Sequence, residues 1–128
     1  MSVFAKTKTL PIQALNWVVA KAEYDELAAA AILHPEHAKH YPKIDPCSDW
    51  SQGGPIIERE QIDLKWVGAN TCRASIDWLD EECYEAFGTT PLVAAMRCFA
   101  VKCFGLEVEV PQSLLAGLDK PTSGSPTL

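Results

Sequence analysis

Basic residues are scarce in this chain of 128 residues. It has 11 lysines and arginines against 17 aspartates and glutamates, which gives a formal net charge of −6. Tight, non-specific binding of nucleic acid needs a basic surface that releases counterions, so this balance argues against that function. The charge is compatible with a basic protein partner and with mimicry of nucleic acid.

Paired cysteines and long apolar runs are also missing. The five cysteines are odd in number and form no CxxC pair, which disfavours both a disulfide framework and a zinc site. No apolar run approaches the ~20 residues of a membrane helix. The start of the chain has lysines without an apolar core behind them, so it does not read as a secretory signal. We therefore expect a cytoplasmic protein with reduced, packed thiols.

The composition that remains is that of a globular protein, with 48% hydrophobic and 22% charged residues. A chain of this size fits one domain with a real core. We expect that domain to span residues 1–118. The polar stretch 119–128, which is rich in serine, proline and threonine, predicts a disordered tail.

Hydrophobic periodicity predicts an α+β fold. Helical spacing of apolar residues indicates one helix over about 10–33 and a second over 90–104, the latter opened by Thr90 and Pro91. Alternation indicates a β-hairpin of strands 62–67 and 71–77, and a short edge strand over 107–110. The expected architecture is a small antiparallel sheet packed against two main helices.

The segment 49–60 has the most varied chemistry in the chain. Its Gly53-Gly54-Pro55 run predicts a turn, so we expect a shaped loop beside the second helix. In one interpretation the loop binds a ligand, with Trp50 stacking on a ring and glycine N–H groups holding an anion. In the other it is a self-supporting turn, with Asp49 accepting local N–H groups and Trp50 filling the core. The candidate binding residues are Asp49, Trp50, Ser51, Gln52, Gly53, Gly54, Glu58, Arg59 and Arg97.

Two further groups of residues are candidates for function. Residues 77–85 carry five acidic side chains without a lysine or arginine and predict a solvated loop or short helix that could bind a partner. A three-residue spacing of histidines makes a weak candidate metal site in a segment that also contains Pro35 and Pro42. The acidic candidates are Asp77, Asp80, Glu81, Glu82 and Glu85, and the histidines are His34, His37 and His40.

Three blocks of the chain together resemble a family of small accessory proteins encoded by tailed bacteriophages and prophages. They are NWVVAKAE at 16–23, DWSQGGPIIERE at 49–60, and TPLVAAMRCF at 90–99 followed by FGLEVEVP at 104–111. The resemblance transfers no activity and no cofactor. It implies an accessory role in the cytoplasm of an infected bacterium.

These observations lead to three functional hypotheses. The first is a non-enzymatic protein that binds a host factor, with inhibition of a bacterial defence system as its role. The second is a small-molecule or nucleotide binder that uses residues 49–60, and the third is a metal-dependent enzyme that uses the histidines. No local motif assembles a catalytic group, and a homodimer through the 107–110 edge is a further hypothesis.

Overall fold

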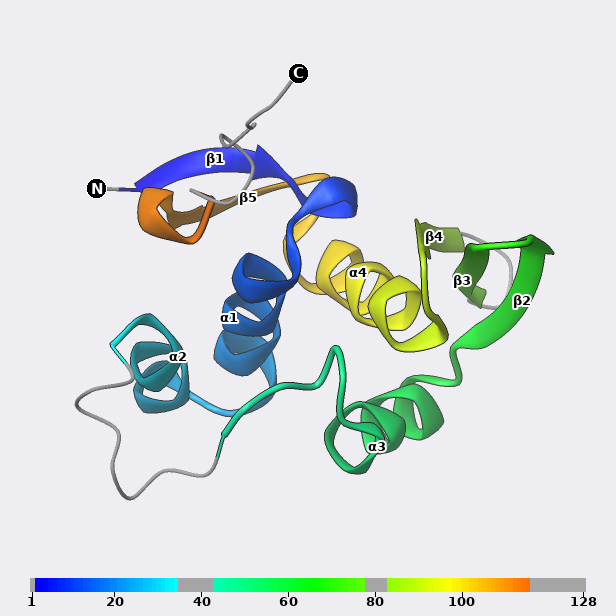
Figure 1. Ribbon diagram of the computed structural model, residues 1–128, viewed down its shortest axis with the longest axis horizontal. Helices are drawn as coiled ribbons and strands as arrows, with labels where there is room; N and C mark the ends of the chain where they lie inside the picture. Colours follow the sequence, from blue (N-terminus) through cyan, green and yellow to red (C-terminus); the bar gives the residue numbers. More distant parts are fainter. Residues whose placement is uncertain (1, 35–42, 78–82, 116–128) are drawn as a thin grey trace.

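A single buried helix, α4 (Pro91–Phe104), lies at the centre of the molecule (Figure 1). The structure is a computed structural model that describes residues 2–34, 43–77 and 83–115. Nine of the 14 residues of α4 are buried. Helix α1 (Ile12–Glu23) lies on one side of α4, and a three-stranded sheet lies on the other. The expected α+β fold is confirmed.

Local signals fix both ends of α4 as the sequence predicted. The hydroxyl of Thr90 accepts a hydrogen bond from the N–H of Val93 at 3.2 Å, and Pro91 occupies the first turn. Gly105 ends the helix at a φ of 87°, a conformation that residues with a Cβ rarely adopt. The helix boundaries follow from these caps, because each satisfies a backbone group that the helix leaves open.

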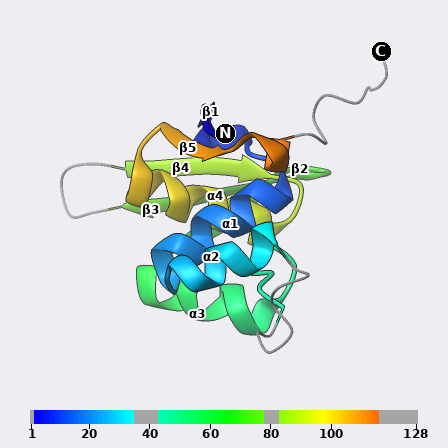
Figure 2. The same ribbon diagram turned by 90° about the vertical axis from the view of Figure 1, so that its left-hand side faces the viewer.

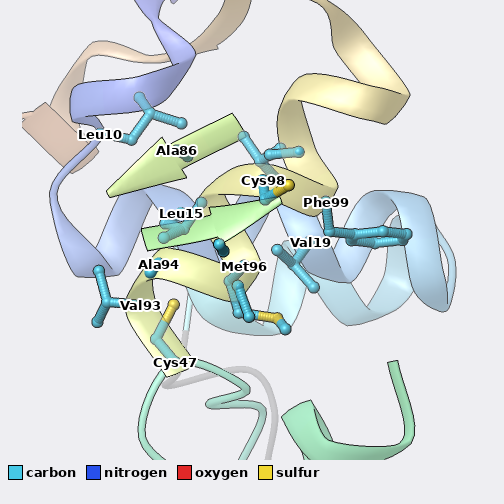
Figure 3. Close-up of a cluster of buried hydrophobic side chains, with 14 of the residues drawn as sticks. Leu10, Leu15, Val19, Cys47, Ala86, Val93, Ala94, Met96, Cys98 and Phe99 are labelled. Atoms are coloured by element: carbon cyan, nitrogen blue, oxygen red, sulfur yellow. The ribbon is translucent and has the colours of Figure 1, made fainter. Parts of the chain in front are cut away.

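The hydrophobic core surrounds α4 (Figure 3). Met96 and Ala94 of α4 are fully buried, as are Leu15 of α1 and Ala86 of the sheet. Small residues on α4 let the sheet approach closely. A Cβ on Gly88 would lie 2.7 Å from the backbone nitrogen of Ala94, so this contact requires glycine.

The three-stranded sheet has the antiparallel order β2-β3-β4. Strands β2 (Asp63–Gly68) and β3 (Thr71–Asp77) form the predicted hairpin. Strand β4 (Cys83–Gly88) was not predicted, since residues 77–85 were interpreted as a loop or short helix. That interpretation was wrong for 83–85, where pairing with β3 and packing on α4 override an unpromising local sequence.

A second sheet joins the two ends of the described chain. Strand β1 (Ser2–Lys6) pairs antiparallel with β5 (Glu107–Pro111), so one edge of the predicted 107–110 strand is covered from within the chain. The 3₁₀ turn η1 (Thr7–Thr9) follows β1, and η3 (Gln112–Leu115) follows β5. Figure 2 shows both strands above α1 and α4.

The helix predicted over 10–33 is two helices. Helix α1 ends at Glu23, and α2 (Glu26–Leu33) begins after Asp25. The carboxylate of Asp25 accepts a hydrogen bond from the N–H of Ala28 at 2.9 Å, which is an N-cap. Helix α2 can therefore fold back and pack on α1.

The largest correction concerns the segment 49–60, which is helix α3 (Trp50–Glu60) and not a loop. The run Gly53-Gly54-Pro55 lies inside this helix, although glycine and proline disfavour helix interiors. Tertiary packing gives the reason. Gly53 is buried, and a Cβ there would lie 2.6 Å from both the Pro46 carbonyl oxygen and Leu92 Cδ2. The glycine serves a close helix contact and does not form a turn.

Within the described ranges, no helix has both the length and the apolar character that crossing a bilayer requires. The tail predicted over 119–128 lies outside those ranges.

The two helical glycines give a matched pair of stability variants. Gly53→Ala forces a methyl group against backbone, which we expect to cost about 1–3 kcal/mol, offset in part by a gain of about 1 kcal/mol in helix propensity. The nearest atom to a Cβ on Gly54 is 3.9 Å away, so Gly54→Ala should raise the free energy of unfolding by about 0.5–1 kcal/mol. Urea unfolding followed by tryptophan fluorescence measures both. Equal effects of the two substitutions would contradict the close contact at Gly53.

Candidate functional site

The residues before α3 are held on α1 by a polar network. Asn16 of α1 donates from Nδ2 to Asp45 Oδ1 at 2.9 Å and accepts from the Cys47 N–H at 3.1 Å. Gln52 accepts from the Asp45 N–H at 2.7 Å and donates to the Lys43 carbonyl at 2.8 Å. The Gln52 amide therefore has its donor and its acceptor engaged within the chain, and its role is to shape the segment.

Asp49 caps helix α3. Its Oδ1 accepts from the Ser51 N–H at 2.9 Å and from the Ser51 hydroxyl at 2.7 Å. The hydrogen bond from the Ser51 hydroxyl, together with that from its N–H, holds the pKa of Asp49 below its ordinary value. Both side chains thus stabilise the start of the helix, as in the interpretation in which Asp49 accepts local N–H groups.

Trp50, next to this cap, is exposed over 55% of its surface. It does not fill the core, although the structural interpretation of this segment expected it to do so. An indole this exposed is available to a partner, because it adds little to packing inside the chain.

Trp50 borders a pocket of about 300 Å³ between α1, α3 and the start of α4. Ile12 and Pro91 contribute apolar walls, while Ser48, Thr89 and Thr90 bring hydroxyl groups. The Thr90 hydroxyl is already engaged as the cap of α4. The pocket is thus mainly apolar, with a few polar groups, which is the usual character of a binding pocket.

Cys47 lies in the wall of the same pocket. Burial, with a smaller contribution from the Asp45 carboxylate, raises the pKa of its thiol to about 12. The thiol is therefore protonated at neutral pH and is a poor nucleophile. It packs as an apolar group in this wall.

The paired glycines do not form an anion cradle. Gly53 is buried against Pro46 and Leu92, and Gly54 lies one residue further along the same helix. Backbone N–H groups inside a helix bond to preceding carbonyls, so they are not presented to a ligand. The local sequence gave no sign of this, because Gly-Gly-Pro is a turn signal in isolation.

Arg59 and Glu60 join three helices. The guanidinium of Arg59 donates to both carboxylate oxygens of Glu23 on α1, at 2.7 and 2.8 Å. Glu60 accepts from Arg59 at 2.9 Å and from Lys102 of α4. Burial alone would raise the pKa of Glu60, but the hydrogen bonds from Lys102 and Arg59 outweigh it and hold that pKa below its ordinary value. Glu58 of the same helix is exposed.

Arg97, a candidate binding residue in the sequence, binds backbone carbonyls within the chain. Its guanidinium donates to the carbonyl of Phe87 in β4 at 3.0 Å and to that of Leu10 at 2.9 Å. Its Nε is buried and has no hydrogen-bond partner among the described residues. Burial lowers the pKa of Arg97 from its ordinary value. Arg97 therefore ties the start of the chain to the sheet through α4.

The acidic candidates do not form one described patch. Glu85 lies in β4 and pairs with Arg73 of β3 at 2.5 Å. Asp77 ends β3, and Asp80, Glu81 and Glu82 lie outside the described residues. The carboxylate of Glu85 thus forms an ion pair with the neighbouring strand of the same sheet.

Of the three histidines, only His34 lies in the described chain, at the end of α2, where its N–H donates to the Ala30 carbonyl at 2.8 Å. His37 and His40 lie outside it. Among the residues whose placement is described, no group of three His, Cys, Asp or Glu side chains could share a metal ion.

The chain matches the model of a known protein family. The chain belongs to a family of bacteriophage proteins, and it is a phage accessory protein. The family is that of bacteriophage P22 NinX, whose model matches residues 7–102, three quarters of the chain. This range includes the pocket, the polar network around Asp45 and the ion pairs between α1, α3 and α4. No curated protein sequence matches the chain.

The ion pairs of Glu60 predict how stability depends on pH. Because its pKa is lowered in the folded state, its contribution is present above the ordinary value of 4.5 and is lost as pH falls through the lowered pKa. Glu60→Gln should therefore unfold at lower urea concentration than the wild type at pH 7, and this difference should shrink as pH falls below about 4.5. Glu58→Gln is the control and should behave as the wild type. A difference that stays constant down to pH 3 would contradict the assignment.

Proposed function

We propose that this phage accessory protein is a non-enzymatic binder of a host protein, and that the pocket beside Trp50 is its docking site. The observation that carries this proposal is the exposed indole at the rim of a mainly apolar pocket. Aromatic anchors next to a pocket are typical of the residues that dominate the energy of protein interfaces.

The size and walls of the pocket fit one large side chain of a partner. Its volume of about 300 Å³ stands at the lower limit for ligand pockets. Ile12, exposed over 47% of its surface, extends the apolar area beside it. A partner side chain inserted here would cover both Trp50 and Ile12, and water would be excluded from the rim.

The overall charge favours a basic partner. A net charge of −6 would steer association with a positively charged surface and would make its rate depend on salt. Host proteins that bind nucleic acid have such surfaces, and components of bacterial defence systems are among them. Inhibition of such a component is the biological role that we propose for the complex.

A small aromatic ligand is the second candidate for the same pocket. Trp50 and the hydroxyl of Ser48 line it and would supply stacking and one hydrogen bond. Gln52, Gly53 and Arg97 make contacts within the fold. Fewer groups are therefore left to bind a nucleotide than the sequence suggested. The host protein is therefore the stronger proposal.

Trp50→Ala tests the docking site. A tagged chain is used to capture partners from lysate of the bacterial host, and affinity for the captured protein is then measured at low and high salt. We expect Trp50→Ala to weaken binding by about 2 kcal/mol or more, which is roughly thirtyfold. Because Trp50 is largely exposed, the variant should keep its unfolding midpoint within about 0.5 kcal/mol of the wild type.

Phe4→Ala is the matched control, since Phe4 is exposed over 70% of its surface on β1, away from the pocket. Equal loss of binding in both variants would reject the pocket as the docking site. Capture of a small molecule and no protein would instead support the second candidate, and affinity independent of salt would reject the basic partner.

A further inference from the structure

Strand β2 is an unpaired, exposed edge of the three-stranded sheet. In the described chain it pairs with β3 alone, and it lies at the periphery of the molecule (Figure 1). Five of its six residues are exposed. Trp66 is exposed over 56% of its surface and Val67 over 49%, next to an irregularity in the pairing with β3 between Trp66 and Gly68. An open edge with exposed apolar side chains is a template for pairing with another strand.

The strand at the opposite edge of this sheet, β4, packs on helix α4. The carbonyls of Phe87 and Tyr84 in β4 accept hydrogen bonds from Arg97 and Cys98 of α4. Helix α4 packs more extensively on β4 than on any other element of the described chain. Of the three strands, β4 is thus the most closely packed on α4 and β2 the least, so β2 is the strand that we examine for pairing.

We propose that β2 pairs antiparallel with β2 of a second copy of this chain, about a twofold axis at Leu64. In this register Leu64 lies opposite Leu64 of the second copy, and Asp63 lies opposite Lys65. The two three-stranded sheets become one sheet of six strands, which is an ordinary size for a sheet. The interface is isologous, as in most homodimers.

Charge complementarity selects this register. Residues that lie opposite each other in an antiparallel pair point to the same face of the sheet. A twofold axis perpendicular to the sheet must therefore run between the two copies of one residue, which then lie opposite each other. An axis at Lys65 would place two lysines opposite each other, and an axis at Trp66 would leave Asp63 beyond the paired region. The axis at Leu64 forms two Asp63–Lys65 pairs, one on each side of the twofold.

The surroundings of Lys65 within one copy support the same register. Lys65 lies opposite Arg73 in the β2–β3 pairing, and Arg73 pairs with Glu85. None of the ion pairs of the described residues includes Asp63 or Lys65. Like charges opposite each other in a sheet are unfavourable, so Lys65 gains from an acidic neighbour on its other side, and Asp63 of the second copy is that neighbour.

The test is a charge-reversal series followed by mass in solution. The wild type should form a species of twice the 14.0 kDa chain mass in sedimentation velocity. Asp63→Lys places lysine opposite lysine, and Lys65→Asp places aspartate opposite aspartate. Each should raise the dissociation constant of the dimer roughly tenfold or more. Both residues are exposed, so neither substitution should unfold the chain, and circular dichroism checks this.

Two restorations make the register falsifiable. The double variant Asp63→Lys with Lys65→Asp should dimerise as the wild type does. A mixture of the two single variants should form heterodimers, because each position then meets its opposite charge. A wild type that stays at 14.0 kDa at its highest soluble concentration would overturn the proposal. A dimer that both single variants leave unchanged would overturn it equally, as would a failure of the mixture to associate. Trp50→Ala, on a different surface, should leave the dimer intact.

Discussion

The burial of helix α4 is the constraint on which the rest of this structure depends. Nine of its 14 residues are buried, so it needs neighbours on nearly every side, and α1, the three-stranded sheet and α3 provide them. Glycines on the neighbouring elements set how close they come to α4, as Gly88 of β4 shows against Ala94 and Gly53 of α3 against Leu92. Arg97 of the same helix also donates hydrogen bonds to the carbonyls of Leu10 and Phe87, which links α4 to the segment before α1 and to β4.

The polar contacts around α3 explain the unusual chemistry of residues 49–60 without a catalytic role. Asp49 caps the helix, Gln52 joins it to the preceding segment, and Arg59 and Glu60 tie it to α1 and α4. Trp50 is the exception, because it is exposed at the rim of a pocket and takes little part in packing. We therefore assign Trp50, which contributes little to the packing of the fold, to the binding of a partner.

Two surfaces of the molecule thus have different proposed occupants. The pocket beside Trp50 lies among α1, α3 and the start of α4, whereas β2 forms the open edge of the three-stranded sheet. A dimer through β2 would carry two copies of the pocket, and a partner with two matching sites would then gain from effective concentration. The two proposals are independent, since each has variants that should leave the other surface unchanged.

The sequence by itself determined the elements whose signals are local. The caps of α4 at Thr90 and Gly105, the hairpin of β2 and β3, and the α+β class all follow from neighbouring residues. Tertiary structure alone decided the pairing of β1 with β5, since loop closure across the whole chain leaves no local pattern. It also decided that Gly53-Gly54-Pro55 is helical, because a buried contact with Pro46 and Leu92 outweighs the turn preference of those residues. Finally, only the tertiary structure shows that Trp50 is exposed while neighbouring residues make contacts within the chain. The exposure of a side chain depends on what packs against it and not on residue type alone.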